Sequence, residues 1–293
     1  MHCYKSRGYG SSIISPFSGA VIDFLGEIYV DDTDLIVTHP DLETQEAVLE
    51  GLYSLAEAWS SGFNSTGGAI NPDKSRWILA AYEWINGIWR YRQQPEVNMT
   101  IPLPDGTRAP ISPGHVTTAE KSLGVWSAID GNDSKHIEEN VSGKTRDWIN
   151  GMRNALLPAH MGWIAYKFKL WAGIRYGIAT LATPLTEVQR VLRPKNCHYL
   201  SFLGINRNVK REWRTIHRAF GGIGLYSFPV EQTIWMINMP VQHYGAGTTL
   251  ANKLSASIEA LQLEIGCIGS PFDENYDNFH LLATPCWTKS LWE

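Results

Sequence analysis

The sequence predicts an α+β fold, with β-hairpins and one helix before about residue 128 and helices after it. Two observations support this. Before residue 128, short β-branched and aromatic segments flank the turn pairs Asn86-Gly87 and Asp105-Gly106, which are typical of β-hairpins. After Asn132 the apolar residues recur with a helical period. Apolar residues make up 44% of the 293 residues, which is core material for about two domains.

The strands and helices are expected in a definite order. A strand over 20–30 leads into a turn at 31–33 and a returning strand over 34–37, and a helix then runs from about 40 to Gly62. The Asn-Gly turn is flanked by strands over 76–85 and 88–92, the Asp-Gly turn by strands over 99–103 and 107–111, and 121–126 forms a further strand. Helices are expected over 134–157, 159–180, about 185–203 and 229–265.

Charge is distributed unevenly along the chain. The net charge is −4 overall, but it is −10 over residues 1–140, +11 over 141–230 and −5 over 231–293. A basic block of this kind predicts contact with a polyanion. A solvated basic helix face is the alternative.

Cysteine usage and apolar runs predict the cellular context. The four cysteines, at 3, 197, 267 and 286, form no close pair, which argues against a zinc knuckle or a disulfide framework. Neither a signal peptide nor a membrane span is expected. The sequence therefore predicts an intracellular protein, cytoplasmic, nuclear or both, that is not secreted.

Asp31 and Asp32 are neighbouring carboxylates at the expected tip of an apolar hairpin. Adjacent strand residues point to opposite faces, so two neighbouring carboxylates reach one site only at a turn. Close carboxylates repel each other, and a divalent cation removes that repulsion. Mg²⁺ is commonly bound by one or two carboxylates together with substrate phosphates, which suits phosphoryl transfer. A plain polar β-turn is the alternative.

Four segments in order resemble those of reverse transcriptases. Ile28-Tyr29-Val30-Asp31-Asp32-Thr33-Asp34-Leu35 resembles the catalytic hairpin of that family, and residues 67–75, Gly-Gly-Ala-Ile-Asn-Pro-Asp-Lys-Ser, resemble the next palm block. Residues 121–125, Lys-Ser-Leu-Gly-Val, resemble the following Leu-Gly strand. Residues 221–225, Gly-Gly-Ile-Gly-Leu, resemble a segment beyond the thumb in LINE-type, non-LTR retroelements. The resemblance covers roughly residues 20–230.

The resemblance implies a fold and domains. It implies part of a right-hand polymerase palm, an antiparallel sheet with the catalytic hairpin and a packed helix, followed by an all-α thumb. The palm part would span 1–128 with a hairpin excursion near 93–113, the thumb 129–228, and a helical extension and tail 229–293.

Roles for individual residues follow from the resemblance. Asp31 and Asp32 would bind Mg²⁺ (or Mn²⁺) and be catalytic, and Tyr29 would pack near the primer terminus. Lys74 matches a lysine near the phosphates of the incoming nucleotide, with a solvated turn lysine as the alternative. Leu123 and Gly124 would position the primer backbone, although a plain edge strand looks the same in sequence.

The basic block corresponds to the thumb. The cations expected to contact the nucleic-acid backbone are Lys167, Lys169, Arg175, Lys210, Arg211 and Arg214. Eight aromatic residues are interleaved with the basic ones. At helical spacing most of them are expected in the core, with one or two at the surface.

The expected activity is RNA-directed DNA synthesis, with an RNA template, a DNA primer and dNTPs as partners and no membrane. In the family another metal-binding Asp lies on an earlier palm strand. Asp23 is expected on the same strand as the hairpin and is therefore not that ligand. The chain is expected to be a fragment that is inactive alone and needs the N-terminal part of the polymerase.

Two other functions stay open at this point. One is a nucleic-acid-binding remnant without catalysis. The other is an unrelated α+β protein with a chance Asp-Asp turn, which would be favoured if residues 121–125 did not lie against the hairpin.

Overall fold

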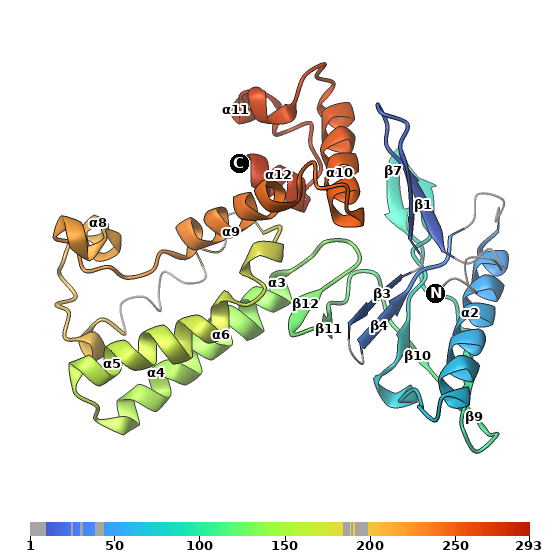
Figure 1. Ribbon diagram of the computed structural model, residues 1–293, viewed down its shortest axis with the longest axis horizontal. Helices are drawn as coiled ribbons and strands as arrows, with labels where there is room; N and C mark the ends of the chain where they lie inside the picture. Colours follow the sequence, from blue (N-terminus) through green and yellow to red (C-terminus); the bar gives the residue numbers. More distant parts are fainter. Residues whose placement is uncertain are drawn as a thin grey trace. The chain divides into compact units, whose positions relative to one another are not determined.

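The protein is seen here in a computed structural model, which describes residues 10–24, 26–29, 32–38, 44–183, 188, 190 and 199–293. It divides into two compact units, Met1–Thr118 and Ala119–Glu293. The division falls somewhat before residue 128, the end of the palm part expected from the sequence. Both units combine helices with small sheets, each of two strands in the described part of the chain (Figure 1).

The first unit contains five of these sheets. The antiparallel pairs are β1–β2, β3–β4, β6–β7 and β8–β9, and the pair β5–β10 is parallel. The strands are β1 (Ser11–Ile14), β2 (Val21–Phe24), β3 (Gly26–Tyr29), β4 (Asp32–Leu35), β5 (Arg76–Trp77), β6 (Tyr82–Ile85), β7 (Ile88–Tyr91), β8 (Thr100–Pro102), β9 (Arg108–Pro110) and β10 (Ser112–Pro113).

The strand expected over 20–30 is divided. Its first half, β2, pairs with β1, a strand that the sequence did not predict, and its second half, β3, pairs with β4. Asp23 therefore lies on a different strand from the hairpin, where its carboxylate accepts a 2.6 Å hydrogen bond from Ser12. The returning strand begins at Asp32 and not at Asp34, because Asp32 already pairs with Tyr29.

The long helix α2 (Gln45–Ser65) starts and stops later than expected. Thr44 caps its first turn by accepting the backbone N–H of Ala47 at 3.2 Å. The helix continues through Gly62 to Ser65, since one glycine costs a helix interior only about 1 kcal/mol.

The helix α2 packs mainly against β8. Leu55 is fully buried, and burying such a side chain stabilises a fold by about 1.5–3 kcal/mol. A core cluster beside this helix contains Trp77, Leu79, Met99, Ile101 and Ile111, and Val48, Leu49, Leu52 and Ala56 of α2 pack against it. Arg108 also links α2 to β8, because its guanidinium donates to Glu57 of the helix at 2.8 Å and to the hydroxyl of Thr100 in the strand at 2.9 Å.

Both hairpins predicted from turn pairs are confirmed. Asn86 and Gly87 have φ values of 52° and 81° between the last paired residues of β6 and β7, the left-handed conformations that a two-residue turn of type I′ requires. Asp105-Gly106 lies between β8 and β9, with Gly106 at φ 83°.

The second unit is mostly helical, as expected, with one hairpin at its start. The hairpin consists of β11 (Glu120–Ser122) and β12 (Val125–Ser127). Helical segments follow as α3 (Ser134–His136), a π-helical stretch (Ile137–Gly143), α4 (Lys144–Ala155), α5 (Ala159–Ala165), a second π-helical stretch (Tyr166–Trp171), α6 (Ala172–Arg175), α8 (Arg211–Thr215), α9 (Phe228–His243), α10 (Thr249–Ile265), α11 (Tyr276–Phe279) and α12 (Trp287–Trp292). Single 3₁₀ turns lie at Pro72–Lys74, Ile178–Thr180, Ser201–Leu203, Arg218–Phe220 and Pro271–Asp273.

Helix boundaries differ from expectation at several points. The segment expected over 134–157 is helical to Ala155, and the one expected over 159–180 is helical to Arg175. The helix expected over 229–265 is two helices, α9 and α10, separated by a segment with Gly245 and Gly247 at positive φ. Most of the helix expected over 185–203 lies outside the described residues.

An aromatic cluster forms the core of the second unit, where α4 lies alongside α5 and α6 (Figure 1). Trp148 makes edge-to-face contacts with Tyr166, Tyr199 and Phe202, with ring centroids 6.2–6.3 Å apart, an arrangement that aromatic rings prefer. A smaller core at the C-terminal end joins α10 to Ala283 and Trp292.

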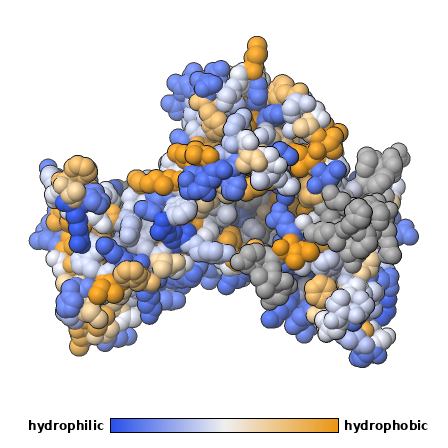
Figure 2. Space-filling view, viewed as in Figure 1, coloured by the Kyte–Doolittle hydropathy of each residue, from blue (hydrophilic) through white to orange (hydrophobic). Residues whose placement is uncertain are grey.

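The helix α9 also exposes apolar residues on one side. They recur at helical spacing and are Val230, Ile234, Ile237 and Val241. Figure 2 shows hydrophobic residues gathered along this helix. Among the helices of the described residues, none has the length and apolar character needed to cross a membrane.

Candidate functional site

The hairpin β3–β4 carries the expected catalytic segment. Tyr29 pairs with Asp32, and Ile28 with Thr33. Val30 and Asp31, the predicted main metal ligand, lie outside the described residues, as does the side chain of Tyr29. Gly26 permits the close approach of the strands, because a Cβ atom there would meet the carbonyl oxygen of Asp34.

Three carboxylates share one face of this hairpin. Glu27 pairs with Asp34, and alternate strand residues point to the same side, so Asp32, Asp34 and Glu27 lie together. The pKa of Asp34 is raised by its partial burial and then by the charges of Glu27 and Asp32. The prediction that Asp32 lies in the turn is wrong. Asp32 is a strand residue, and Asp34 is the other carboxylate on the same face of that strand.

Sequence reasoning missed Glu27 and Asp34 as members of this face, although the alternation of residues 32 and 34 was a signal for the second. In the described part of the chain, no group of three or more His, Cys, Asp or Glu residues has the arrangement of a metal site. Since Asp31 is outside that part, the metal-binding role of Asp31 and Asp32 stays a prediction.

Lys74 ends a 3₁₀ turn, Pro72–Lys74, which Asn71 caps by accepting the N–H of Asp73 at 3.1 Å. Its side chain is exposed. This is the position of a lysine on a solvated turn, and its predicted contact with nucleotide phosphates stays a prediction.

Leu123 and Gly124 form a turn and not a strand. Ser122 pairs with Val125, and the two residues between them have φ values of 50° and 82°. The strand predicted over 121–126 is therefore a tight hairpin, with Leu123 in the left-handed region that residues with a Cβ seldom occupy. The ring of Tyr176 lies against the turn, 3.1 Å from where a Cβ of Gly124 would be.

A cluster of lysines surrounds this hairpin, and nothing in the spacing of the sequence indicated it. The amine of Lys135 lies 3.9 Å from the ring centroid of Trp126, and that of Lys121 lies 5.9 Å from it. The pKa of Lys144 is lowered by burial and by the charge of Lys121. We call Lys121, Lys135 and Lys144 the lysine cluster. The amines of Lys135 and Lys144 also donate to the carbonyls of Ala119 and Gly173, at 3.1 and 2.8 Å, and each keeps further N–H donors. Like charges brought together in this way favour binding of an anion.

The six cations predicted to contact nucleic acid differ in their surroundings. Lys167 and Lys169 are exposed. Arg175 is exposed and lies over the ring of Trp235, 4.5 Å from its centroid. Lys210 and Arg211 are exposed at the start of α8.

Arg214 has a structural role that the sequence did not indicate. Its guanidinium donates hydrogen bonds to the backbone oxygens of Arg207 and Val209, at 2.8 and 2.9 Å. These bonds use two of its five N–H donors and hold the side chain against the backbone, which leaves it less suited to phosphate than the exposed cations.

The interleaved aromatic residues mostly belong to the core, as expected. Trp148, Tyr166, Trp171 and Tyr199 are buried and Trp163 is half-buried. Three are exposed, one more than expected: Phe168, Tyr176 and Trp213. Phe168 is 76% exposed between two exposed lysines, an arrangement that suits stacking on a base or sugar.

The Gly-Gly-Ile-Gly-Leu segment turns the chain back along α8. Gly221 and Gly224 have positive φ values of 80° and 73°, and a Cβ on Gly222 would meet the backbone of Ile216. The N–H of Leu225 donates to the carbonyl of Arg214 at 2.8 Å, and its side chain is buried in the aromatic core. The glycines are therefore accounted for by packing.

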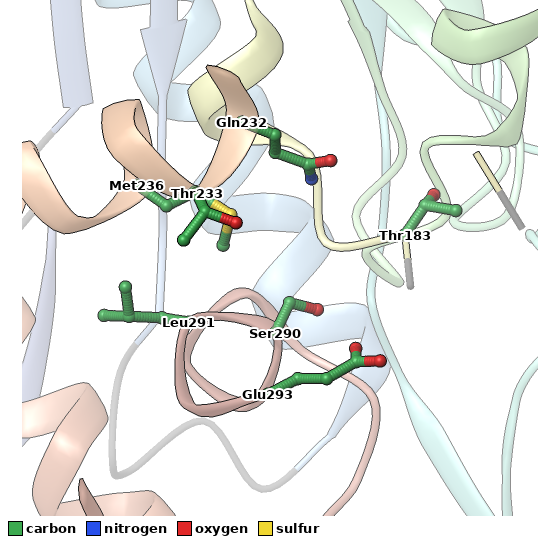
Figure 3. A pocket seen from close by; sticks show the side chains of 7 residues that line it. All are labelled: Thr183, Gln232, Thr233, Met236, Ser290, Leu291 and Glu293. Atoms are coloured by element: carbon green, nitrogen blue, oxygen red, sulfur yellow. The ribbon is translucent and has the colours of Figure 1, made fainter. Parts of the chain in front are cut away.

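A pocket in the second unit has none of the predicted site residues in its lining. Figure 3 shows the seven residues that line it, Thr183, Gln232, Thr233, Met236, Ser290, Leu291 and Glu293. The amide nitrogen of the buried Gln232 donates to the carbonyl of Leu181 at 3.3 Å. Its oxygen has no hydrogen-bond partner in the described structure, so the pocket offers an acceptor to water or another small donor.

Comparisons with models of protein families, with curated proteins and with solved structures find no significant match to this chain.

Proposed function

We propose that this chain provides the catalytic hairpin and thumb of an RNA-directed DNA polymerase, a reverse transcriptase of the LINE-type, non-LTR kind. The observation that carries the proposal is the carboxylate face of β3–β4. There a raised pKa of Asp34 accompanies a resemblance to the Tyr-x-Asp-Asp hairpin. The lysine cluster and the exposed cations of the second unit support contact with a nucleic-acid backbone.

In this proposal the carboxylates of Asp31 and Asp32 hold Mg²⁺ (or Mn²⁺), and carboxylate oxygens are ligands that Mg²⁺ prefers. Such ions, when bound, would stabilise the charge that develops on the transferred nucleotidyl group. The primer 3′-hydroxyl would lose its proton to solvent and attack the α-phosphate of the dNTP, so that a P–O bond to the primer forms while the bond between the α- and β-phosphates breaks and pyrophosphate leaves. Leu123 and Gly124, at the tip of the β11–β12 hairpin, position the primer backbone beside the lysine cluster.

Two-metal catalysis needs carboxylates from more than one strand, with the ions about 3.5–4 Å apart. In the resembled family an aspartate on an earlier palm strand supplies the remaining ligand. We therefore expect no primer extension by the 293 residues alone, and extension after fusion to fingers and first palm strands of a related enzyme.

The test is primer extension on a poly-A template with Mg²⁺. The fused protein should extend the primer, and Asp31→Asn in it should abolish extension. Asp23→Asn is the matched control, because Asp23 is a strand carboxylate outside the β3–β4 hairpin, on β2, where it is bonded to Ser12. Extension that survives Asp31→Asn refutes the proposal. Robust extension by the unfused chain would leave the polymerase function standing and overturn only the expected inactivity, because it would require a further carboxylate ligand within the chain.

The lysine cluster also supports a second candidate function, nucleic-acid binding without catalysis. This function needs no metal. A fused protein that binds duplex tightly and salt-dependently, yet never extends a primer, would favour it.

A further inference from the structure

The pocket lined by residues of α9 and α12 has walls that hydrogen bonds hold in place. Gln232 of α9 donates to the carbonyl of Leu181 at 3.3 Å, and Ser290 of α12 donates to the carbonyl of Ala182 at 2.6 Å. Both helices are therefore bonded to the same short segment, which also supplies Thr183 to the lining. The hollow has a volume of about 80 Å³, more than the roughly 10–15 Å³ that one water molecule needs. We call it the Gln232 pocket.

An acceptor without a partner lies at the inner end of the Gln232 pocket. The Gln232 side chain is 1% exposed, and its amide oxygen accepts no hydrogen bond in the described structure. The carbonyl of Leu181 fixes the orientation of the amide, because only the amide nitrogen can donate to it. A buried oxygen that is left unbonded destabilises the fold, and a donor bound in the pocket would remove that cost.

Two hydroxyls of the lining already donate elsewhere. Ser290 donates to a backbone carbonyl, and Thr183 donates to the buried carboxylate of Asp133. Each hydroxyl oxygen still has a lone pair with which it can accept a bond. The donors left to the pocket are fewer, namely the hydroxyl of Thr233 and the second N–H of Gln232. The lining therefore offers more acceptors than donors.

Charge and apolar walls narrow the choice of ligand. Glu293, exposed at the rim, adds a carboxylate, and none of the seven lining residues that the structure describes is lysine, arginine or histidine. Met236 and Leu291 supply apolar walls (Figure 3). An anion has no donors for these acceptors and would be repelled by Glu293. A ligand that matches the lining has several N–H donors, a positive charge and a short alkyl part.

The arrangement of the acceptors favours an ammonium over a guanidinium group. They come from three places in the chain, with Gln232 on α9, Ser290 on α12 and Thr183 before α9. The three N–H bonds of an ammonium point apart and can reach acceptors on different sides, whereas the donors of a guanidinium lie in one plane.

We infer that the Gln232 pocket binds a small alkylammonium ion. The ammonium group donates to the Gln232 oxygen and to the hydroxyl oxygens, and the charge of Glu293 favours its entry. The alkyl part lies against Met236 and Leu291. Free amines and the lysine side chain of a partner protein share this chemistry. The inference does not rest on the proposed function, because the pocket contains none of the residues assigned to that function.

The test uses the six methionines of the chain as probes. In the full chain, isotope-labelled at its methionine methyl groups, propylammonium chloride should shift the NMR signal of Met236 saturably. Met236→Leu assigns that signal. The signal of Met99, which lies in the core of the first unit, should not move. Tetramethylammonium is the matched probe, because it has the same charge and no N–H donor, and it should produce no saturable shift.

Two variants test the assigned contacts. Gln232→Leu removes the buried acceptor and should weaken propylammonium binding by about tenfold or more, the effect of losing a hydrogen bond to a charged group. Glu293→Gln, at the exposed rim, should weaken it by roughly two- to fivefold, and it keeps the test decisive if Gln232→Leu does not fold. Glu231→Gln is the matched control, because Glu231 is an acid of α9 outside the lining, and it should leave the affinity unchanged.

Nα-acetyl-lysine amide distinguishes the two sources of the ammonium group. Binding at least as tight as that of propylammonium assigns the pocket to the lysine side chain of a partner, and weaker binding assigns it to a free amine. No saturable shift of Met236 with either compound overturns the inference and leaves water as the occupant. An equal shift with tetramethylammonium also overturns it, and so does a saturable shift with acetate, which would show that the pocket presents donors.

Discussion

Nδ1 of His136 accepts the backbone N–H of Trp126 over 3.1 Å, and this bond ties the β11–β12 hairpin to the start of the first helix of the second unit. His136 is fully buried, and Asn140 lies 3.0 Å from its other ring nitrogen. The atom of Asn140 at that nitrogen is its amide Nδ2, which also lies 3.5 Å from the carbonyl of Tyr176. Because Nδ1 is an acceptor in its bond with Trp126, it carries no proton in the neutral ring. A second proton on the ring would face the Trp126 N–H.

The first prediction is that the folded second unit loses stability at acidic pH. Burial, together with the charge of Lys144, lowers the pKa of His136 from 6.5 to about 4. Between those values the unfolded chain binds a proton that the folded chain does not, so stability falls as pH falls from 6.5 towards 4. The full loss is on the order of 3 kcal/mol. Urea unfolding of the wild type at about pH 7 and about pH 5, on either side of the ordinary histidine pKa, should detect about 2 kcal/mol of this loss, since pH 5 lies about 1.5 units below that pKa.

His136→Asn keeps an acceptor for the Trp126 N–H but does not titrate, so this variant should lose much of the pH dependence. The exposed His115→Asn is the matched control and should behave as the wild type. Equal pH dependence in all three proteins would show that His136 is not responsible.

The second prediction concerns the carboxylate face. Asp34→Asn should stabilise the first unit in the absence of metal, because it removes a repelling charge whose pKa is raised by burial, Glu27 and Asp32. Millimolar Mg²⁺ should raise the melting temperature of the wild type, since an ion that binds only the folded state stabilises it. Asp32→Asn should reduce that rise. A rise that is unchanged in Asp32→Asn would place the ion elsewhere.

The third prediction separates a turn from a strand at Leu123. A β-branched residue resists the positive φ of 50° found there, so Leu123→Val should destabilise the protein by about 1–2 kcal/mol. Leu123→Asn should be neutral or stabilising, because asparagine tolerates this conformation. If 121–126 were one strand, the two substitutions would have the opposite order. Chemical denaturation of both variants decides between them.

The predictability of each hairpin depends on its turn residues. Asn86-Gly87 and Asp105-Gly106 were predicted because those pairs favour positive φ. Leu123-Gly124 was assigned to a strand, because leucine has no such preference and only its surroundings hold it there. Asp32 was assigned to the turn on the chemistry of paired carboxylates, whereas its pairing with Tyr29 makes it a strand residue.

Most of the other features that the sequence did not predict depend on interactions between segments that are distant in the sequence. The lysine cluster joins residues that lie far apart in sequence, and no spacing rule links Lys121 to Lys144. Arg214 was expected at a phosphate for its charge, but nearby carbonyls take two of its donors. The resemblance to a polymerase hairpin located the carboxylates. Their third member on the described face, Glu27, emerges only from the register of β3 and β4.

The last prediction concerns salt dependence. Duplex affinity should fall steeply with salt, because each bound phosphate releases counterions. Lys167→Gln/Lys169→Gln should flatten the slope of log K against log salt by about two, one for each phosphate that is no longer neutralised. Adding Arg175→Gln should bring the change to about three if Arg175 leaves the ring of Trp235, over which it lies at 4.5 Å, to reach a phosphate. A change that stops at about two would show that Arg175 stays with that ring.

Arg214→Gln is the control, expected to lower stability with little effect on the slope because its guanidinium is bonded to Arg207 and Val209. Anisotropy titrations of each variant over a series of salt concentrations give the slopes. A wild-type slope retained by the double lysine variant would show that these lysines face away from the bound duplex.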